Sequence, residues 1–508
     1  RKAGELFREA GHLVKEEDYT IALATCSRCG TPIEYAIFPQ WWLRMKPLAE
    51  EVLKGLRRGD IAFVPERWKK VNIDWLENVK DWNISRQLWW GHQIPAWYCE
   101  DCQAVNVPKP ERYLEDPTSC EACGSPRLKR DEDVFDTWFS SALWPLSTLG
   151  WPEETEDLKA FYPGDVLVTG YDILFLWVSR MEVSGYHFMG ERPFKTVLLH
   201  GLVLDEKGQK MSKSKGNVID PLEMVERYGA DALRFALTYL ATGGQDIRLD
   251  LRWLEMARNF ANKLYNAARF VLLSREGFQA KEDTPTLADR FMRSRLSQGV
   301  EEITALYEAL DLAQAAREVY ELVWSEFCDW YLEAAKPALK AGNAHTLRTL
   351  EEVLAVLLKL LHPMMPFLTS ELYQALTGKE ELALEAWPEP GGRDEEAERA
   401  FEALKQAVTA VRALKAEAGL PPAQEVRVYL EGETAPVGEN LEVFRFLARA
   451  DLLPERPAKA LVKAMPRVTA RMPLEGLLDV EEWRRRQEKR LKELLALAER
   501  SQRKLSAK

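Results

Sequence analysis

The sequence predicts a chain of several domains, with a mixed α/β first half followed by a mostly helical second half. Three observations support this fold class. Twelve of the 17 tryptophans lie before residue 178, whereas the later sequence is rich in Ala, Leu and Glu. Short apolar runs typical of buried parallel strands lie near the middle of the chain, and apolar residues recur at helical spacing after residue 220. A chain of 508 residues is too long for one hydrophobic core, so we expect three or four domains.

Composition and charge narrow the function classes. Apolar residues make up 46% and charged residues 29% of the chain, which excludes a largely disordered protein. No apolar run reaches the ~18 residues of a membrane helix, and residues 1–10 lack the apolar centre of a signal peptide, so we expect a soluble cytoplasmic protein with no membrane partner. The net charge of −11 argues against non-specific nucleic-acid binding, but residues 481–508 hold ten basic against five acidic residues. Such a basic arm suits a partner that docks at selected places, although it is also compatible with a solvated helix face.

Two segments near the middle predict an α/β unit. Residues 165–168 and 195–199 are short apolar runs that each lead into a turn, and the helix-like stretch 171–188 lies between them. This order is typical of a doubly wound parallel sheet. Ligands of such sheets bind outside the carboxyl ends of the strands, which here lie at Gly170 and His200.

The sequence after Pro221 predicts an antiparallel helical bundle, because apolar residues recur three and four positions apart and the connections are short and polar. The predicted helices are 221–242, 251–275, 284–309, 311–338, 345–360 and 365–377. A helix at 400–417 and a strand at 425–430 predict a small α/β module, and apolar residues near heptad spacing from residue 479 predict a coiled-coil arm.

Six of the seven cysteines form Cys-x-x-Cys pairs, a pattern that indicates metal binding. The pairs Cys99/Cys102 and Cys120/Cys123 are separated by 17 residues, which suits a closed four-thiolate zinc site of structural type; four unrelated thiols are the alternative.

The remaining cysteines do not complete a site. Cys26 and Cys29 form half of a second zinc site: either they are idle, or their partners lie on sequence that this chain lacks. Cys328 stands alone in a predicted helix and is expected to be a small core residue.

The stretch Lys210-Met-Ser-Lys-Ser214 lies in a loop between Gly208 and Gly216, after the predicted strand that ends at His200. Its two lysines, Lys210 and Lys213, could close over a polyphosphate and neutralise charge that grows on the α-phosphate and the departing pyrophosphate. A solvated surface loop is the alternative.

These residues resemble the class I aminoacyl-tRNA synthetases, whose second signature matches residues 210–214 letter for letter and is extended by Gly216-Asn217-Val218. The run Val168-Thr-Gly-Tyr-Asp-Ile-Leu-Phe-Leu-Trp177 resembles the valine-specific branch more than the isoleucine-specific one. Three further segments are similar to the valine, isoleucine and leucine subgroup: Ile84-Ser-Arg-Gln-Leu-Trp-Trp-Gly-His-Gln-Ile-Pro95, Phe135-Asp-Thr-Trp-Phe-Ser-Ser141 and Leu361-His-Pro-Met-Met-Pro-Phe-Leu368.

The resemblance implies an ATP- and Mg²⁺-dependent ligase that forms a valyl-adenylate, releases pyrophosphate and passes valine to its tRNA. It also implies a role for each matching residue. Lys210 and Lys213 would bind the phosphates as catalytic residues, and Gly170 and Asp172 would contact the adenylate ribose. His200, Gly201 and Val203 would border the nucleotide. Trp138 and Trp177 would form the walls of the valine pocket. Plain core packing is the alternative for the two tryptophans, and a loop-capping core histidine is the alternative for His200.

The first class I signature, His-x-Gly-His, does not occur in this sequence. The resemblance therefore implies the C-terminal portion of such an enzyme, a monomer that is inactive alone. The expected parts are the tail of an editing-domain insertion at 1–20, the second half of the Rossmann-like catalytic domain at 21–215 with a zinc ribbon at 95–130, a connecting module at 216–255, a helical anticodon-binding domain at 256–390, the small α/β module at 397–475 and a truncated basic coiled-coil arm at 479–508.

Two other functions remain compatible with these residues. An isoleucine-specific ligase would differ in the amino acid that supports pyrophosphate exchange. A non-catalytic, zinc-containing tRNA-binding protein would suit the missing signature, but it would not explain the intact lysine motif, both tryptophans and the half zinc site together.

Overall fold

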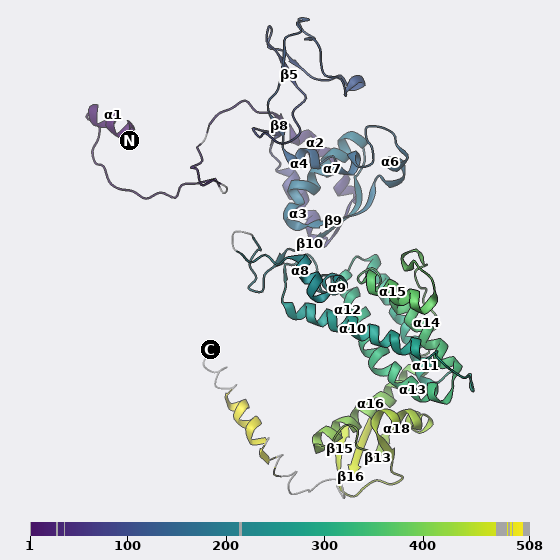
Figure 1. The fold of residues 1–508 in the computed structure, drawn as a ribbon. Helices are drawn as coiled ribbons and strands as arrows, with labels where there is room; N and C mark the ends of the chain where they lie inside the picture. The colour runs from purple at the N-terminus through teal and green to yellow at the C-terminus, as the bar shows by residue number, and fades with distance from the viewer. Residues whose placement is uncertain are drawn as a thin grey trace. The chain divides into compact units, whose positions relative to one another are not determined.

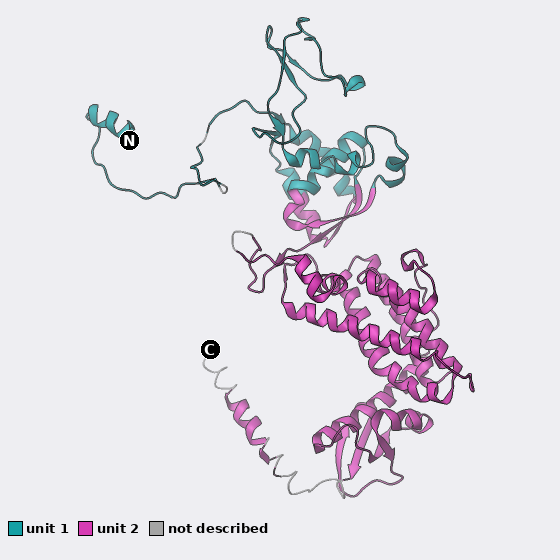
Figure 2. Ribbon diagram, viewed as in Figure 1, with its two compact units in different colours: residues 1–58, 73–163, 176–193 teal, residues 59–72, 164–175, 194–508 magenta. Residues whose placement is uncertain are grey.

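The computed structural model describes residues 2–26, 29–34, 36–212, 216–473, 485, 488–489 and 491–500 (Figure 1). Lys213 and most of the predicted arm at 479–508 therefore lie outside the described residues. The chain divides into two compact units, which are treated separately below (Figure 2). Unit 1 comprises residues 1–58, 73–163 and 176–193, and unit 2 comprises residues 59–72, 164–175 and 194–508.

Unit 1 combines short antiparallel strands with helices. β1 pairs with β3, β4 pairs with β8, and β5 lies between β6 and β7 in a three-stranded sheet. Helices α2 and α7 approach closely, because a side chain on Gly55 of α2 would collide with the Tyr186 ring of α7. The elements are α1 (Lys2–Glu9), β1 (Trp42–Leu43), α2 (Met45–Arg58), β3 (Trp82–Asn83), β4 (Ser85–Arg86), β5 (Trp97–Cys99), β6 (Val105–Asn106), β7 (Leu128–Arg130), β8 (Val134–Phe135), α4 (Thr137–Ser141), α5 (Trp144–Ser147), α6 (Glu156–Phe161) and α7 (Ser179–Met189). Helix α3 (Arg67–Glu77) begins in unit 2 and ends in unit 1.

Unit 2 begins with a three-stranded parallel sheet of order β2-β10-β9. Its strands are β2 (Ala62–Val64), β9 (Gly164–Gly170) and β10 (Phe194–His200). The sequence predicts the two longer strands, and the parallel order of β9 and β10 is confirmed. β2 is missed, since three residues are too few to carry a strand pattern.

Two shorter strands and two helices follow the sheet. β11 (Val203–Leu204) pairs in parallel with β12 (Ile247–Arg248). The predicted single helix 221–242 is wrong, because the structure has α8 (Pro221–Tyr228) and α9 (Ala230–Leu240). Gly229 separates them with φ of 96° and ψ of 149°, a backbone conformation that ends a helix.

The bundle follows the helical pattern of the sequence closely. Its helices are α10 (Leu251–Leu273), α11 (Leu287–Glu308), α12 (Leu312–Glu321), α13 (Leu332–Ala341), α14 (Ala344–Leu361) and α15 (Pro366–Thr377), with the π-helical stretch Leu322–Tyr331 joining α12 to α13. Five of the six predicted helices are confirmed within a few residues at either end, counting α12 to α13 as one continuous run. Among the described residues, no helix is both long and apolar enough to cross a membrane.

The C-terminal α/β module packs on the same core as the bundle. Its four-stranded sheet has the order β14-β13-β16-β15, and one hydrophobic cluster of buried residues runs from Met224 to Met472. The elements are α16 (Glu395–Ala418), β13 (Val426–Gly432), α17 (Ala435–Glu439), α18 (Leu441–Ala448), β14 (Ala450–Leu452), β15 (Ala460–Ala464) and β16 (Val468–Pro473).

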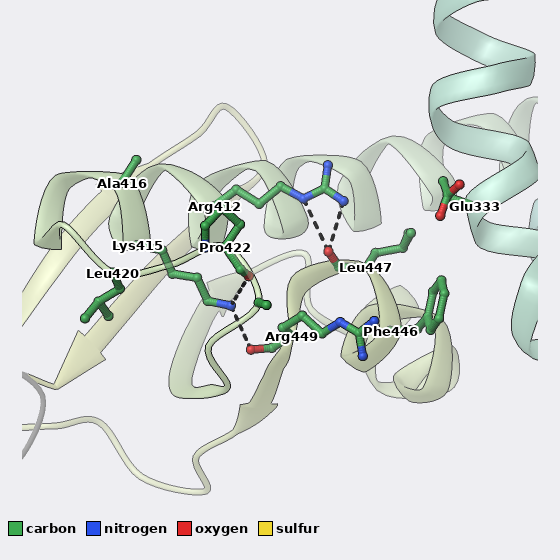
Figure 3. A pocket seen from close by; sticks show the side chains of 10 residues that line it. Glu333, Arg412, Lys415, Ala416, Leu420, Pro422, Phe446, Leu447 and Arg449 are labelled. Carbon is green, nitrogen blue, oxygen red and sulfur yellow. Dashed lines mark hydrogen bonds between the residues drawn. The ribbon is translucent and has the colours of Figure 1, made fainter. Parts of the chain in front are cut away.

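Two cations of α16 terminate α18 (Figure 3). The buried Lys415 ammonium donates to the carbonyls of Ala448 and Arg449 at 2.8 and 2.9 Å, and Arg412 donates to the Leu447 carbonyl. The last carbonyls of a helix have no partner within it and carry partial negative charge, so these cations satisfy the end of α18.

Candidate functional site

The carboxyl ends of β9 and β10 meet in unit 2, as expected. Gly170 and His200 are direct register partners there. A side chain on Gly170 would come within 2.7 Å of Asp172 Oδ1, so the glycine leaves room for this carboxylate beside the strand end. His200 Nδ1 lies 2.8 Å from the Gly201 carbonyl oxygen and donates to it, which fixes the ring and leaves Nε2 as an acceptor. His200 is exposed, which argues against a core histidine.

Lys210 lies beside this strand end. Its Nζ is 3.9 Å from Asp172 Oδ2, and the Lys210 side chain is 71% exposed. An exposed ion pair of this length contributes little to stability, so the ammonium is free to exchange its partner for a ligand. Lys213, the second predicted phosphate-binding lysine, lies outside the described residues.

Asp205 and Asn217 hold the two ends of the lysine loop. The sequence marks Asn217 as part of the run that extends the signature, but it misses Asp205. Asn217 Nδ2 donates to Asp205 Oδ2 at 2.8 Å, while Asn217 Oδ1 accepts from the Ser212 amide at 2.9 Å. The hydrogen bond from Asn217, together with amide bonds from Gln209 and Lys207, holds the pKa of Asp205 below its usual value. The available signal was the Asp205-x-x-Gly208 pattern of a turn.

Gly201 and Val203 continue from β10. A side chain on Gly201 would collide with the Gln245 carbonyl, so the glycine permits a close backbone approach. Val203 pairs with Ile247 in the β11–β12 ladder. Thus the described part of unit 2 brings together six of the predicted residues: Gly170, Asp172, His200, Gly201, Val203 and Lys210.

The two predicted pocket tryptophans belong to unit 1, where helix α4 links them. Trp138 is the second residue of α4, and its amide donates to the capping carboxylate of Asp136 at 3.0 Å. Trp177 Nε1 donates to the Ser141 carbonyl at the other end of α4, and its ring lies 5.8 Å from that of Trp144. Both tryptophans are half-buried.

Asp136 connects Trp138 to a cavity of about 750 Å³ in unit 1. Its Oδ2 accepts from Arg86 Nη2 at 2.5 Å and from Trp82 Nε1 at 3.1 Å. Arg180 lies 3.6 Å from the Trp82 ring centroid, and burial lowers the pKa of its guanidinium. These cations and indoles line the cavity together with Trp138, Asp81 and Asp136, which makes its wall aromatic and charged with both signs.

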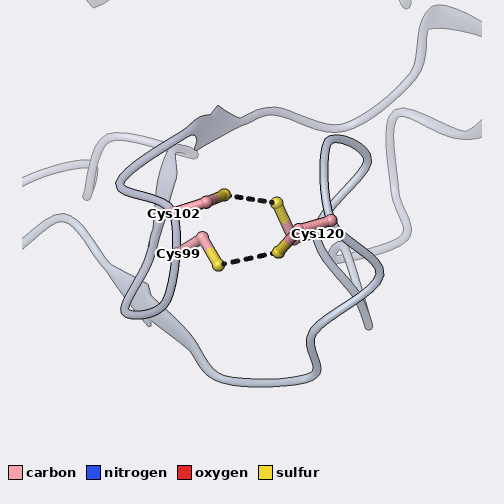
Figure 4. Close-up of side chains that lie close together, drawn as sticks. Cys99, Cys102 and Cys120 are labelled. Atoms are coloured by element: carbon pink, nitrogen blue, oxygen red, sulfur yellow. Dashed lines mark hydrogen bonds between the residues drawn. The ribbon is translucent and has the colours of Figure 1, made fainter.

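Cys99, Cys102, Cys120 and Cys123 converge in unit 1, with all four sulfurs within 4.8 Å of one another (Figure 4). The Cys99–Cys123 and Cys102–Cys120 sulfur distances are 3.6 and 3.5 Å. Four thiolates at ~2.3 Å from a zinc ion would lie ~3.8 Å apart in an ideal tetrahedron, so the cluster fits this ion.

The electrostatics of the cluster also suit a cation. Burial opposes ionisation of Cys120, but amide hydrogen bonds from Cys123 and Ala122 outweigh it and lower the pKa of Cys120 to about 6. The Ser125 amide lowers the pKa of Cys123, yet the neighbouring sulfurs dominate and raise it to about 12. Thiolates are the form of cysteine that ligates a metal, so a divalent cation bound here would displace the remaining thiol protons.

Cys26 and Gly30 share a backbone hydrogen bond that also occurs in the cluster. The Gly30 amide donates to the Cys26 carbonyl and Gly30 has φ of 71°, just as the Gly124 amide donates to the Cys120 carbonyl with φ of 76°. The pKa of Cys29 is lowered to about 7, chiefly by a hydrogen bond with Thr31. No further metal ligand joins this pair among the residues that the structure describes.

Comparison with known protein families gives two matches along the chain. Residues 13–250 match the tRNA synthetases class I (I, L, M and V), and residues 289–430 match the anticodon-binding domain of tRNA ligase.

Individual relatives agree with these matches. The chain is 99% identical over 507 residues to a valine–tRNA ligase of Thermus thermophilus and 49% identical over 522 residues to one of Deinococcus radiodurans. It spans 59% and 57% of the length of these two relatives, and they cover 100% and 96% of it. A methionyl-tRNA synthetase from Mycobacterium tuberculosis in complex with methionyl-adenylate has a similar fold, with a TM-score of 0.56 at 20% identity over 73% of this chain and 71% of that one.

Proposed function

We propose a function for this chain from its family: it belongs to the valine–tRNA ligases of the class I tRNA synthetases. It supplies the second half of the site that activates valine, together with the helices that bind the valine tRNA. The observation that carries this proposal is the meeting of Gly170, Asp172, His200 and Lys210 at one sheet edge. Acidic, imidazole and ammonium groups at the ends of parallel strands suit a nucleotide.

The reaction assigned to this site has two steps. A carboxylate oxygen of valine attacks the α-phosphorus of ATP, and the bond to pyrophosphate breaks. A hydroxyl of the tRNA 3′ end then attacks the acyl carbon, and AMP leaves. Mg²⁺, when bound, neutralises phosphate charge.

In the first step, Lys210 stabilises the negative charge that grows on the phosphates. Its ammonium is held only by a long, exposed ion pair with Asp172, so it can move to the phosphates. We assign the same role to Lys213. Asp172 accepts hydrogen bonds from the ribose, and Gly170 allows the nucleotide to approach the strand. His200, Gly201 and Val203 border it.

Trp138 and Trp177 are proposed as walls of the valine pocket. The Trp138 backbone is fixed at the start of α4 and the Trp177 indole is bonded to its end, so this short helix relates the two residues. Two rigid aromatic walls exclude side chains larger than valine by steric overlap. The isoleucine-specific alternative is disfavoured by the valine-specific relatives.

The cysteine cluster is proposed to hold a structural zinc ion in the ribbon at 95–130, with Cys99, Cys102, Cys120 and Cys123 as its four ligands. The preformed turn at Cys26 and Cys29 supports a second zinc site that these residues would share with another segment.

The remaining parts follow the expected division. We propose the connecting module at 216–255, the anticodon-binding bundle at 256–390, the small α/β module at 397–475 and a basic coiled-coil arm at 479–508, in an enzyme that acts as a monomer on valine, ATP and the valine tRNA. Binding of tRNA to basic segments would weaken as salt rises.

Valine-dependent exchange of pyrophosphate into ATP tests this function. Three samples are compared: the chain alone, the chain mixed with the N-terminal part of the Thermus thermophilus relative, and the same mixture in which the chain carries Lys210→Gln. We expect exchange in the mixture, and Lys210→Gln should lower its rate at least tenfold. Lys195 pairs with Asp165 on the sheet, so Lys195→Gln serves as the control and should change the rate little. No exchange in a mixture that assembles would favour the non-catalytic tRNA-binding protein.

A further inference from the structure

Residues 243–246, called the 243–246 turn below, pack against the end of β10. A side chain on Gly201 would collide with the Gln245 carbonyl, and one on Gly244 would come within 3.0 Å of the Leu199 carbonyl oxygen. Both backbone groups of Leu202 are hydrogen-bonded at this turn. The Leu202 amide donates to Asp246 Oδ1 at 2.9 Å, and the Leu202 carbonyl accepts from Ile247, the residue after the turn, at 2.8 Å.

The same turn reaches the end of β9 through Tyr171. The Tyr171 hydroxyl donates to Asp246 Oδ1 at 3.0 Å. This hydrogen bond is the main reason that the pKa of Tyr171 lies above its usual value. The Tyr171 ring also stacks on Trp68, with centroids 5.3 Å apart and planes 11° from parallel.

One carboxylate oxygen therefore joins the residue that follows β9 to a residue that follows β10. Tyr171 lies between Gly170 and Asp172, and Leu202 lies between Gly201 and Val203. Every nucleotide-binding residue proposed on these two strand ends is thus within two residues of a group held by Asp246.

We propose that Asp246 is a positioning residue for the nucleotide site, which fixes the segments that follow β9 and β10 relative to each other. This inference rests on the function proposed above. Asp246 acts through the backbone of residues 170–172 and 200–203 and through the Tyr171 hydroxyl. Preorganised groups bind a ligand more tightly, because they lose less freedom when it arrives.

Exposure separates this role from a contribution to folding. Asp246 is exposed, so its removal leaves no buried group without a partner and costs the fold little. A residue that only stabilised the fold would lower the melting temperature and the active fraction, and it would leave the KM for ATP unchanged.

The experiment uses the full-length Thermus thermophilus relative with Asp246→Ala, Asp246→Asn, Tyr171→Phe or Glu255→Ala, numbered as in this chain. Pyrophosphate exchange gives kcat and the KM for ATP and for valine, and equilibrium dialysis gives the Kd for ATP. We expect Asp246→Ala to raise the KM and Kd for ATP about three- to tenfold, the effect of one or two exposed hydrogen bonds. The KM for valine and the melting temperature should stay close to those of the natural protein.

The matched variants sharpen the test. Asp246→Asn keeps an Oδ1 that accepts both hydrogen bonds, so it should restore most of the ATP affinity. Tyr171→Phe loses only one of the two hydrogen bonds, so its ATP affinity should lie between those of Asp246→Ala and Asp246→Asn. Glu255→Ala removes a carboxylate from an exposed position of α10 and should have no effect.

Unchanged ATP affinity in Asp246→Ala, or an equal loss in Asp246→Asn, would overturn the proposal. If the natural enzyme showed no valine-dependent exchange, the proposed function would fail, and the dialysis series would still decide the role of Asp246.

Discussion

Asp289 keeps a carboxylate in the core of the bundle with no exposed surface. Its two oxygens accept hydrogen bonds from the Tyr331 hydroxyl at 2.6 Å, from Thr346 Oγ1 at 2.8 Å and from the Thr286 amide at 2.9 Å. These donors come from the π-helical stretch, from α14 and from the residue before α11. A buried charge is tolerated only where such donors replace water, so this residue ties three segments together.

Tyr331→Phe tests this arrangement. We expect it to lower the free energy of unfolding by about 1.5–3 kcal/mol at pH 7, because the Asp289 carboxylate loses a buried donor. Burial and then Asp289 raise the pKa of Tyr331 well above its usual value. The contribution of Tyr331 is therefore complete below pH ~10 and is lost as the pH rises further, because only the unfolded tyrosine ionises there. The difference between the two proteins should narrow in that range. Urea denaturation at pH 7 and above pH 10 measures this, with the exposed Tyr265→Phe as a control.

At the scale of single elements, α15 receives its cap from another helix. Met365, the residue before α15, makes no side-chain cap. Asp231 of α9 supplies the carboxylate, and its oxygens accept from the amides of Phe367 and Leu368 at 3.3 and 2.6 Å. A carboxylate at a helix N-terminus also interacts favourably with the helix dipole.

Asp231→Ala should therefore lower the free energy of unfolding by about 1 kcal/mol, and Asp231→Asn should lower it by less, since the amide still accepts hydrogen bonds without the charge. Guanidinium denaturation followed by circular dichroism gives both values. Equal stability of Asp231→Ala and the natural protein would show that water caps α15 equally well.

The three-stranded β6-β5-β7 sheet contributes Cys99 to the cysteine cluster. A zinc ion bound by this cluster would supply folding free energy directly. We expect about one zinc per chain from the 99–123 cluster, which Cys120→Ser should abolish and Cys328→Ser should leave unchanged. Metal analysis after dialysis checks the stoichiometry. Zinc content unaffected by Cys120→Ser would contradict the four-thiolate assignment.

At the scale of the whole molecule, the bundle and the C-terminal module share one continuous core between Met224 and Met472. Residues 219–473 expressed alone should therefore fold, give a mostly helical circular dichroism spectrum and unfold in a single transition. Two separate transitions would show that the module at 397–475 is independent of the bundle.

The predictability of the structure differs between its parts. The long helices were predictable from their apolar period, as were β9 and β10 from their composition. The break at Gly229 and the strand β2 depend on tertiary contacts and on backbone geometry that periodicity does not encode. The strand ends at Gly170 and His200 were predictable because topology places ligands there. Asp246 and Asp205 were not, since each acts on residues that only folding brings near. Asn217 was marked by the signature, but its bonds to Asp205 and Ser212 were not predictable.

The capping of α18 by α16 has a consequence for recombination between relatives. The donors Lys415 and Arg412 precede residue 419, and the carbonyls that they satisfy lie at 447–449. Any parent supplies backbone carbonyls at 447–449, whereas the donors depend on the side chains at 412 and 415. A chimera with its crossover between 419 and 447 therefore keeps this cap when the parent that supplies α16 has cations at both positions.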